Sequence, residues 1–327
     1  MGVLAYKFPN EPEVIRVGIW SDSNLDKLPE PSFFVTDFLK QHVYAFDLAQ
    51  SKTVDTISDV QEFHRTDTIP HFIAKQEYLE RLNGFQHEMK QQEIQKAIFS
   101  RVKQVKTQLS IAEIFNTLCE KYAANALVYC ISDASFGTWI GATPEILISG
   151  TEQELRTTAL AGTKNEKHIE WRQKEKEEQG YVSDYIHEKL LQFVPNNRIQ
   201  TEAPHTFFTG AVYHLKNDFK FPLKSDKWSE LIQVLHPTPA VCGVPTEKAA
   251  KLISQQEPHN RKLYTGIIGL KNKDYIQSYV NLRCMEYAKN ECWLYLGGGI
   301  TNDSSPMEEW NETENKALTL VKVIGEN

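Results

Sequence analysis

Several signatures of common protein classes are missing from this sequence of 327 residues. No apolar run approaches the roughly 18 residues of a transmembrane helix, and the first residues do not resemble a secretory signal. A P-loop, a dinucleotide-binding glycine fingerprint and a Ser-His-Asp order are also absent. We therefore expect a cytoplasmic protein with no membrane partner, and we exclude the nucleotide-binding and serine-hydrolase motifs.

Cysteine is scarce, and no two cysteines form a Cys-x-x-Cys pair. The five cysteines are scattered, mostly within apolar runs: Cys119, Cys130, Cys242, Cys284 and Cys292. Zinc motifs and disulfide frameworks need regular spacings or an even count, so neither is expected. Isolated cysteines in apolar runs are typical of buried free thiols in a reducing compartment.

An excess of basic charge is also lacking. The net charge is −7, which argues against a nucleic-acid partner, because such proteins usually present a basic face. The composition is that of an ordinary globular protein, with 41% hydrophobic and 24% charged residues. The length allows two domains or one large α+β unit.

Hydrophobic periodicity predicts runs of strands separated by isolated helices. Helices are predicted at 75–92, 110–122 with Ser110 as N-cap, 167–193, 227–235 and 246–256, and an acidic helix begins near Pro306. Strands are predicted at 14–20, 32–35, 42–46, 97–102, 126–131, 137–140, 145–148, 155–160, 206–208, 211–215, 264–270, 275–287 and 292–296. This order favours an α+β fold over an alternating parallel one.

Two pairs of glutamates have the spacing of neighbours on one helix face. Glu309 and Glu312 follow the triple glycine that starts at Gly297, where the backbone can approach another group closely. Glu175 and Glu178 repeat the spacing on the predicted helix at 167–193. Facing each other, the two pairs would form an all-oxygen site that suits Mg²⁺. The alternative is that both are simply solvated helix faces.

Three further charged residues lie in or beside apolar strands. Lys96 starts one strand, where lost hydration would lower its pKa and make it a base, although a lysine at a strand edge can also reach water. Glu145 follows a proline before an apolar strand and is a candidate general acid or an exposed turn residue. Arg283, predicted to lie within a strand, is a candidate anion anchor unless an internal glutamate pairs with it.

Together these motifs resemble the chorismate-utilising enzymes, a family of isochorismate synthases, salicylate synthases and the large subunits of anthranilate and aminodeoxychorismate synthases. The resemblance covers roughly residues 75–327, and the motifs follow the family's order: 95–101, 141–145, 160–163, 174–186, 212–215, 236–245, 257–266, 283 and 296–316. It implies an α+β fold of two antiparallel β-sheets packed as a sandwich with outer helices. Residues 1–70 would be a strand-rich part of that fold, and residues 71–327 its chorismate-binding catalytic core.

The resemblance also implies a role for each matched residue. Lys96 matches the base that activates water for attack on C2 of the ring, and Glu145 the acid that protonates the departing C4 hydroxyl. The expected Mg²⁺ ligands are Glu178 and Glu312, with Glu175 and Glu309 acting through water. The expected substrate-binding residues are Gly162, Thr163, His214, Ala240, Tyr264, Arg283, Gly297 and Lys316.

The alanine at position 240 favours one member of the family. Isochorismate synthases typically have alanine there, whereas anthranilate and salicylate synthases usually have threonine. We therefore expect Mg²⁺-dependent conversion of chorismate to isochorismate, for menaquinone or siderophore synthesis, by a monomer without a glutaminase subunit. A salicylate or amine-forming synthase and an inactive ligand-binding homologue are the alternatives. Gln179 and Cys242 depart from the family's usual His and Ser without removing a proposed catalytic group.

Overall fold

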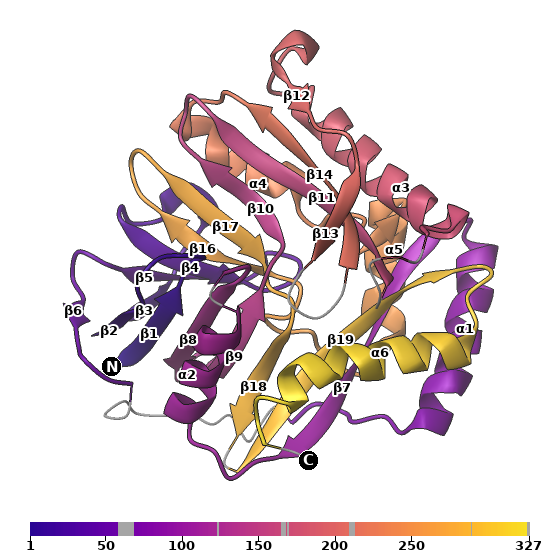
Figure 1. Cartoon of the computed structure of the whole chain (residues 1–327), viewed down its shortest axis with the longest axis horizontal. Helices are drawn as coiled ribbons and strands as arrows, with labels where there is room; N and C mark the ends of the chain where they lie inside the picture. Colours follow the sequence, from indigo (N-terminus) through magenta and orange to yellow (C-terminus); the bar gives the residue numbers. More distant parts are fainter. Residues whose placement is uncertain are drawn as a thin grey trace.

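Two antiparallel β-sheets face each other in the computed structural model, and helices cover their outer faces (Figure 1). The structure describes residues 1–57, 69–122, 124–164, 168, 170–208, 213–288 and 290–325, apart from the side chains of Thr163 and Lys174. This arrangement confirms the predicted α+β sandwich. Within the described ranges, no helix is both long and apolar enough to cross a bilayer.

The first sheet has nine strands, and its order mixes elements from the whole chain. From one edge to the other it contains β15 (Gly243–Val244), β7 (Lys96–Lys106), β19 (Glu291–Thr301), β18 (Cys284–Ala288), β9 (Gly137–Thr143), β8 (Leu127–Asp133), β1 (Gly2–Lys7), β2 (Val14–Gly18) and β6 (Lys52–Thr53). The longest pairing joins β19 to β7 and sets Thr301 opposite Lys96 and Gly299 opposite Ile98.

The second sheet has ten strands, nine of them along its main path. It contains β12 (Gln200–Thr201), β14 (Tyr213–Phe221), β11 (Leu155–Lys164), β10 (Ile146–Gly150), β17 (Ile276–Val280), β16 (Ile267–Lys271), β4 (Ser32–Thr36), β5 (Val43–Asp47) and β3 (Trp20–Asp22), and β13 (His205–Phe208) pairs with β14. Strands from the first 57 residues thus join both sheets.

The core between the sheets is rich in aromatic side chains. The rings of Trp139 and Tyr295 stack with centroids 5.0 Å apart, and Tyr264 stacks on Tyr295 at 5.7 Å. Strand β4 is buried along its whole length, because one face meets this core and the other meets a helical layer. Burial on both faces explains why many strands appear in the sequence as continuous apolar runs.

Helices supply the outer layers. The helices α2 (Ile111–Tyr122) and α6 (Pro306–Val321) pack on the first sheet, and α1 (Lys75–Gln91) and α5 (Thr246–Gln256) cover its edge at β7. The second sheet is covered by α3 (Gln173–Leu190) and α4 (Trp228–Leu235) (Figure 1). Ser110 and Glu113 exchange side-chain and backbone hydrogen bonds at the start of α2, so the predicted N-cap is confirmed as a capping box.

Two predicted strands are wrong because the chain changes sheet within them. The strand predicted at 14–20 ends at Gly18, and β3 then joins the other sheet. The strand predicted at 275–287 divides into β17 and β18. Arg283 lies between these strands with a φ of 45°, so its predicted position inside a strand is wrong. A left-handed residue interrupts a ladder and lets the chain pass from one sheet to the other.

Other boundaries also differ from the prediction. Residues 264–266 form a turn, and β16 begins only at Ile267. Helix α3 begins at Gln173, because the backbone of Arg172 is extended. The first residue of the predicted helix, Lys167, and the first two of the strand predicted at 211–215 lie outside the described residues.

Candidate active site

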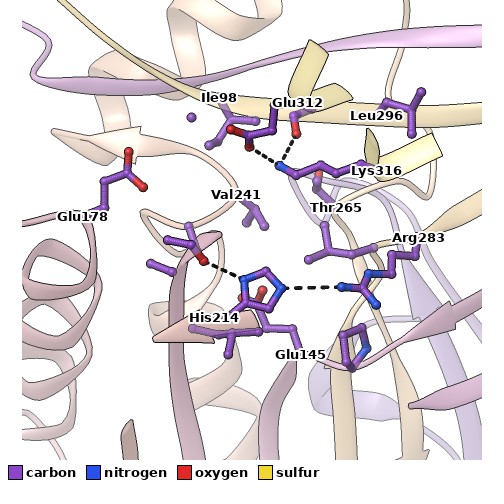
Figure 2. A pocket seen from close by; sticks show the side chains of 18 of the residues that line it. Ile98, Glu145, Glu178, His214, Val241, Thr265, Arg283, Leu296, Glu312 and Lys316 are labelled. Atoms are coloured by element: carbon purple, nitrogen blue, oxygen red, sulfur yellow. Dashed lines mark hydrogen bonds and ion pairs between the residues drawn. The ribbon is translucent and has the colours of Figure 1, made fainter. Parts of the chain in front are cut away.

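A cavity of about 150 Å³ is lined by strands of both sheets and by helices α3 and α6 (Figure 2). It gathers residues from motifs that are far apart in the chain. Those predicted from the sequence are Lys96, Glu145, Gly162, Glu178, His214, Ala240, Tyr264, Arg283, Gly297, Glu312 and Lys316. Glu175 and Glu309 do not line the cavity, and nothing is described of the Thr163 side chain.

Lys96 begins β7 and is only 3% exposed. Its side chain runs beside the glycines of β19: a Cβ on Gly299 would lie 3.0 Å from Cε and 3.6 Å from Nζ of Lys96. Burial lowers the pKa of the Lys96 ammonium, while the charge of Glu178 opposes this shift. A lysine whose pKa is lowered by burial gives up its proton more readily and can act as a base.

Glu145 lies between β9 and β10 and is 5% exposed. Its carbonyl oxygen accepts a 2.9 Å hydrogen bond from the backbone N–H of Val280, which fixes the turn against β17. Burial raises the pKa of the Glu145 carboxyl to about 8, although the positive charges of Lys96 and Arg283 act in the opposite direction. Glu145 is therefore protonated at neutral pH and can donate a proton.

His214 and Arg283 form one side of the cavity (Figure 2). Burial lowers the pKa of His214 to about 3, and the Arg283 charge acts in the same direction, so the imidazole is neutral. Its Nδ1–H donates to the carbonyl of Gly162 at 2.7 Å, because a carbonyl can only accept. Nε2 is therefore an acceptor and receives a hydrogen bond from Nη2 of Arg283 at 3.5 Å.

Lys316 and Glu312 lie on α6 above the opposite side of the cavity (Figure 2). The Lys316 ammonium contacts Oε1 of Glu312 at 2.8 Å and donates to the carbonyl of Gly297 at 2.8 Å. A Cβ on Gly297 would approach the Tyr264 hydroxyl to 2.7 Å, so glycine is needed for this close packing. These contacts hold the middle of α6 against the glycine run.

The four predicted metal-site carboxylates come from α3 and α6, and three of them have protein partners. Glu175 pairs through Oε1 with Arg172, Glu309 accepts a 2.7 Å hydrogen bond from Ser304, and Glu312 pairs with Lys316. Within the described ranges, no three His, Cys, Asp or Glu side chains are close enough to hold a metal ion as they stand.

The chemistry of this donor set nevertheless fits Mg²⁺, which prefers carboxylate oxygens. Glu178 faces the cavity across from Lys316 (Figure 2). Oε2 of Glu175 is buried and has no hydrogen-bond partner among the described residues, so it retains an acceptor site for a cation or its water. Burial acts to raise the pKa of Glu175, but the hydrogen bond and charge of Arg172 outweigh it and lower the pKa, which keeps the carboxylate ionised.

Sequence reasoning missed part of the cavity wall. Ile98, Val241 and Thr265 line the cavity, as do Leu160, Leu282, Tyr295 and Leu296. Thr265 has a φ of 59°, which is unusual for a β-branched residue. The adjacent Gly266 is a turn signal, but the predicted strand at 264–270 included it. The apolar residues carry no signal that separates a cavity wall from an ordinary core.

The two antiparallel sheets thus place cationic and carboxylate side chains around one small cavity. The sequence signature of the family "Chorismate binding enzyme" matches residues 35–325. The chain belongs to the chorismate-binding enzymes, and the predicted family is confirmed.

Similar proteins include isochorismate synthases. The chain is 27% identical over 249 residues to isochorismate synthase EntC of Escherichia coli K12, covering 71% of this chain and 63% of that protein. It is 31% identical over 202 residues to isochorismate synthase DhbC of Bacillus subtilis, covering 58% of this chain and 50% of that protein. The match thus spans less than two thirds of either relative.

The fold is similar to that of MenF, the menaquinone-specific isochorismate synthase from Escherichia coli. The TM-score is 0.82 at 19% identity, and the match covers 99% of this chain and 89% of the MenF chain. At this level of identity the likeness shows a common fold.

Proposed function

We propose that this chorismate-binding enzyme is an isochorismate synthase, which isomerises chorismate to isochorismate. The observation that carries the proposal is the pair of buried groups on one cavity: Lys96, whose pKa burial lowers, and Glu145, whose pKa burial raises to about 8. An amine whose protonation burial opposes and a protonated carboxyl would thus face one substrate. Base and acid in this arrangement suit a reaction in which one hydroxyl enters as another leaves.

The proposed reaction begins when Lys96 takes a proton from a water molecule that attacks C2 of the ring. The new C2–O bond forms as the ring double bonds shift and the C4–O bond breaks. Glu145 gives its proton to the departing C4 hydroxyl, which leaves as water. One water is consumed and one released, so substrate and product are isomers. Lys96 ends protonated and Glu145 ionised, and proton exchange with solvent restores both.

The two carboxylates of chorismate would be bound at separate places. Arg283, Tyr264 and the backbone of Gly297 would hold the enolpyruvyl carboxylate, with His214 orienting the Arg283 guanidinium through their hydrogen bond. When bound, Mg²⁺ would supply the charge that holds the ring carboxylate beside Gly162 and Thr163.

The residues that would hold the metal are the carboxylates of α3 and α6. Glu178 and Glu312 are the proposed direct ligands, and Glu175 and Glu309 would act through water. Lys316, now paired with Glu312, would add positive charge at the same end of the cavity.

Ala240, which lines the cavity, supports isochorismate as the product. A salicylate synthase would also eliminate pyruvate, and an amine-forming synthase would need ammonia, which a glutaminase subunit would deliver. We propose a monomer that uses water and needs neither. The division near residue 70 stays a prediction, as does the menaquinone or siderophore pathway.

The test is incubation of the purified chain with chorismate and Mg²⁺, followed by chromatographic identification of the product with and without ammonium. Isochorismate formed without ammonium is the expected result. Salicylate as the main product, or a requirement for ammonium, would contradict the proposal in favour of another family reaction. No conversion by the folded protein would favour an inactive homologue.

A further inference from the structure

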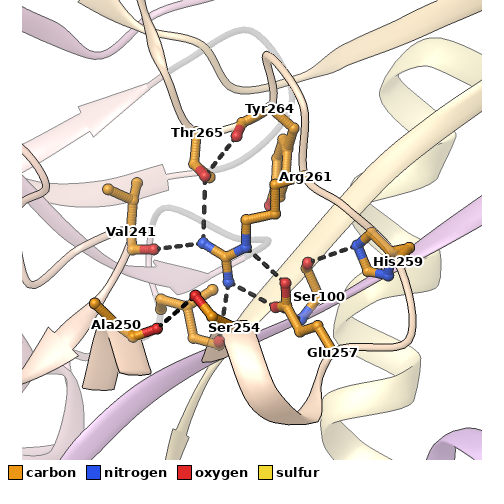
Figure 3. Close-up of polar contacts among 10 residues, drawn as sticks. Ser100, Val241, Ala250, Ser254, Glu257, His259, Arg261, Tyr264 and Thr265 are labelled. Atoms are coloured by element: carbon orange, nitrogen blue, oxygen red, sulfur yellow. Dashed lines mark hydrogen bonds and ion pairs between the residues drawn. The ribbon is translucent and has the colours of Figure 1, made fainter. Parts of the chain in front are cut away.

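Behind the cavity lies a fully buried ion pair that the proposed mechanism does not use. Arg261 follows α5 and is 4% exposed, and its guanidinium binds both carboxylate oxygens of Glu257, at 2.8 Å from Nε and 2.6 Å from Nη2 (Figure 3). Glu257 also accepts the backbone N–H of Ser100 on β7 at 2.7 Å. A bidentate, buried pair of this kind has a fixed geometry.

The remaining N–H groups of Arg261 bind three separate segments of the cavity wall. Nη1 donates to the carbonyl of Val241 at 2.9 Å and to Oγ1 of Thr265 at 3.2 Å (Figure 3). Nη2 donates to the carbonyl of Ile98 at 3.1 Å. Each of these acceptors belongs to a residue that lines the cavity, whereas Arg261 itself does not. The guanidinium thus uses all of its donors to join β7, the loop before β15 and the turn before β16.

The last of these segments is conformationally strained. Lys262 and Thr265 have φ values of 49° and 59°, and such conformations persist only where surrounding contacts enforce them. The Thr265 hydroxyl accepts from Arg261 and donates to the carbonyl of Tyr264 at 2.6 Å, and the Thr265 N–H donates to the carbonyl of Asn281. This turn brings Tyr264 and Thr265 to the cavity.

We propose that Arg261, held by Glu257, is a positioning residue that sets the shape of the substrate cavity without touching substrate. It fixes Ile98, Val241 and the strained turn relative to one another. A lysine at this position could still pair with Glu257, but its single ammonium cannot reproduce a planar fork that reaches two backbone carbonyls and the Thr265 hydroxyl. The expected effect on chorismate conversion rests on the proposed function. The expected effect on the turn at residues 262–266 does not.

The first test compares Arg261→Lys with Arg101→Lys. Arg101 is also buried and ion-paired, but its partners Thr313 and Glu314 do not line the cavity. We expect Arg261→Lys to raise KM for chorismate about tenfold with a smaller change in kcat, because displaced walls weaken binding. Arg101→Lys should lower the melting temperature and leave KM unchanged. An equal rise of KM in both variants, or no rise in Arg261→Lys, would overturn the proposal.

Hydrogen exchange gives a second measurement that does not depend on activity. The amides of residues 262–266 should exchange faster in Arg261→Lys than in wild type, and at the wild-type rate in Arg101→Lys. If Arg261→Lys fails to fold, the double variant Glu257→Gln/Arg261→Gln leaves no unpaired buried charge and allows the same comparison. A wild type that does not convert chorismate would refute the proposed function, whereas unchanged exchange in the turn would refute the role of Arg261.

Discussion

Replacing Glu145 by glutamine is expected to stabilise the fold while it abolishes turnover. Glutamine has nearly the shape of a protonated glutamate but cannot ionise. In wild type the pKa of Glu145 rises from 4.5 to about 8 on folding, mainly because of burial. Below pH 4.5 both folded and unfolded chains carry the proton, so Glu145 costs no stability. As pH rises toward 8, the unfolded chain releases the proton while the folded chain must keep it, so stability is lost.

The size of this effect follows from the pKa shift. At about 1.4 kcal/mol per pKa unit, the cost in wild type is about 3 kcal/mol at pH 7 and approaches about 5 kcal/mol above pH 8. The Glu145→Gln variant cannot ionise in either state, so its free energy of unfolding does not contain this loss. Its free energy of unfolding should therefore equal that of wild type near pH 4 and exceed it by about 3 kcal/mol at pH 7.

Urea unfolding of both proteins at pH 4, 5.5, 7 and 8 measures this difference. Comparing the two proteins at each pH cancels the titration of groups that do not interact with Glu145. A difference that is constant across the pH range, or a wild type more stable than the variant at pH 8, would refute the argument. Retention of isochorismate formation by the variant would refute the role of Glu145 as the acid, independently of its effect on stability.

Three further substitutions test the site. Lys96→Ala should lose turnover but keep Mg²⁺-dependent chorismate binding in calorimetry; surviving activity would contradict the assignment of the base. Gly299→Ala places a methyl group 3.0 Å from the Lys96 Cε and should lower kcat about tenfold. Its control is Gly84→Ala, where the added Cβ meets open space, and this variant should leave kcat unchanged. Arg172→Gln removes the guanidinium that pairs with Glu175 and should tighten Mg²⁺ binding about threefold. Titration calorimetry without chorismate measures this binding, and weaker binding would contradict the expectation.

Helices were predicted well from the sequence where their caps and periodicity depend on neighbouring residues. Ser110 and Glu113 form a cap within one turn of helix, and α5 has the predicted bounds of 246–256. Helix capping and amphipathic periodicity depend on residues a few positions apart, so the sequence displays them directly. The breaks at Ile19 and Arg283 carry no such signal, because the strands on either side of each break pair with distant strands in different sheets.

The sequence by itself determined the chemistry available to the site: a lysine and a glutamate in apolar strands, two pairs of spaced carboxylates, and a triple glycine beside one of them. Only the tertiary structure decided which of these groups are buried around one cavity. The pKa values of Lys96 and Glu145 depend on burial by segments far away in the chain, and Arg261 connects walls separated by more than a hundred residues. Desolvation and buried hydrogen bonds arise only when distant segments pack together, so a short stretch of sequence does not predict them.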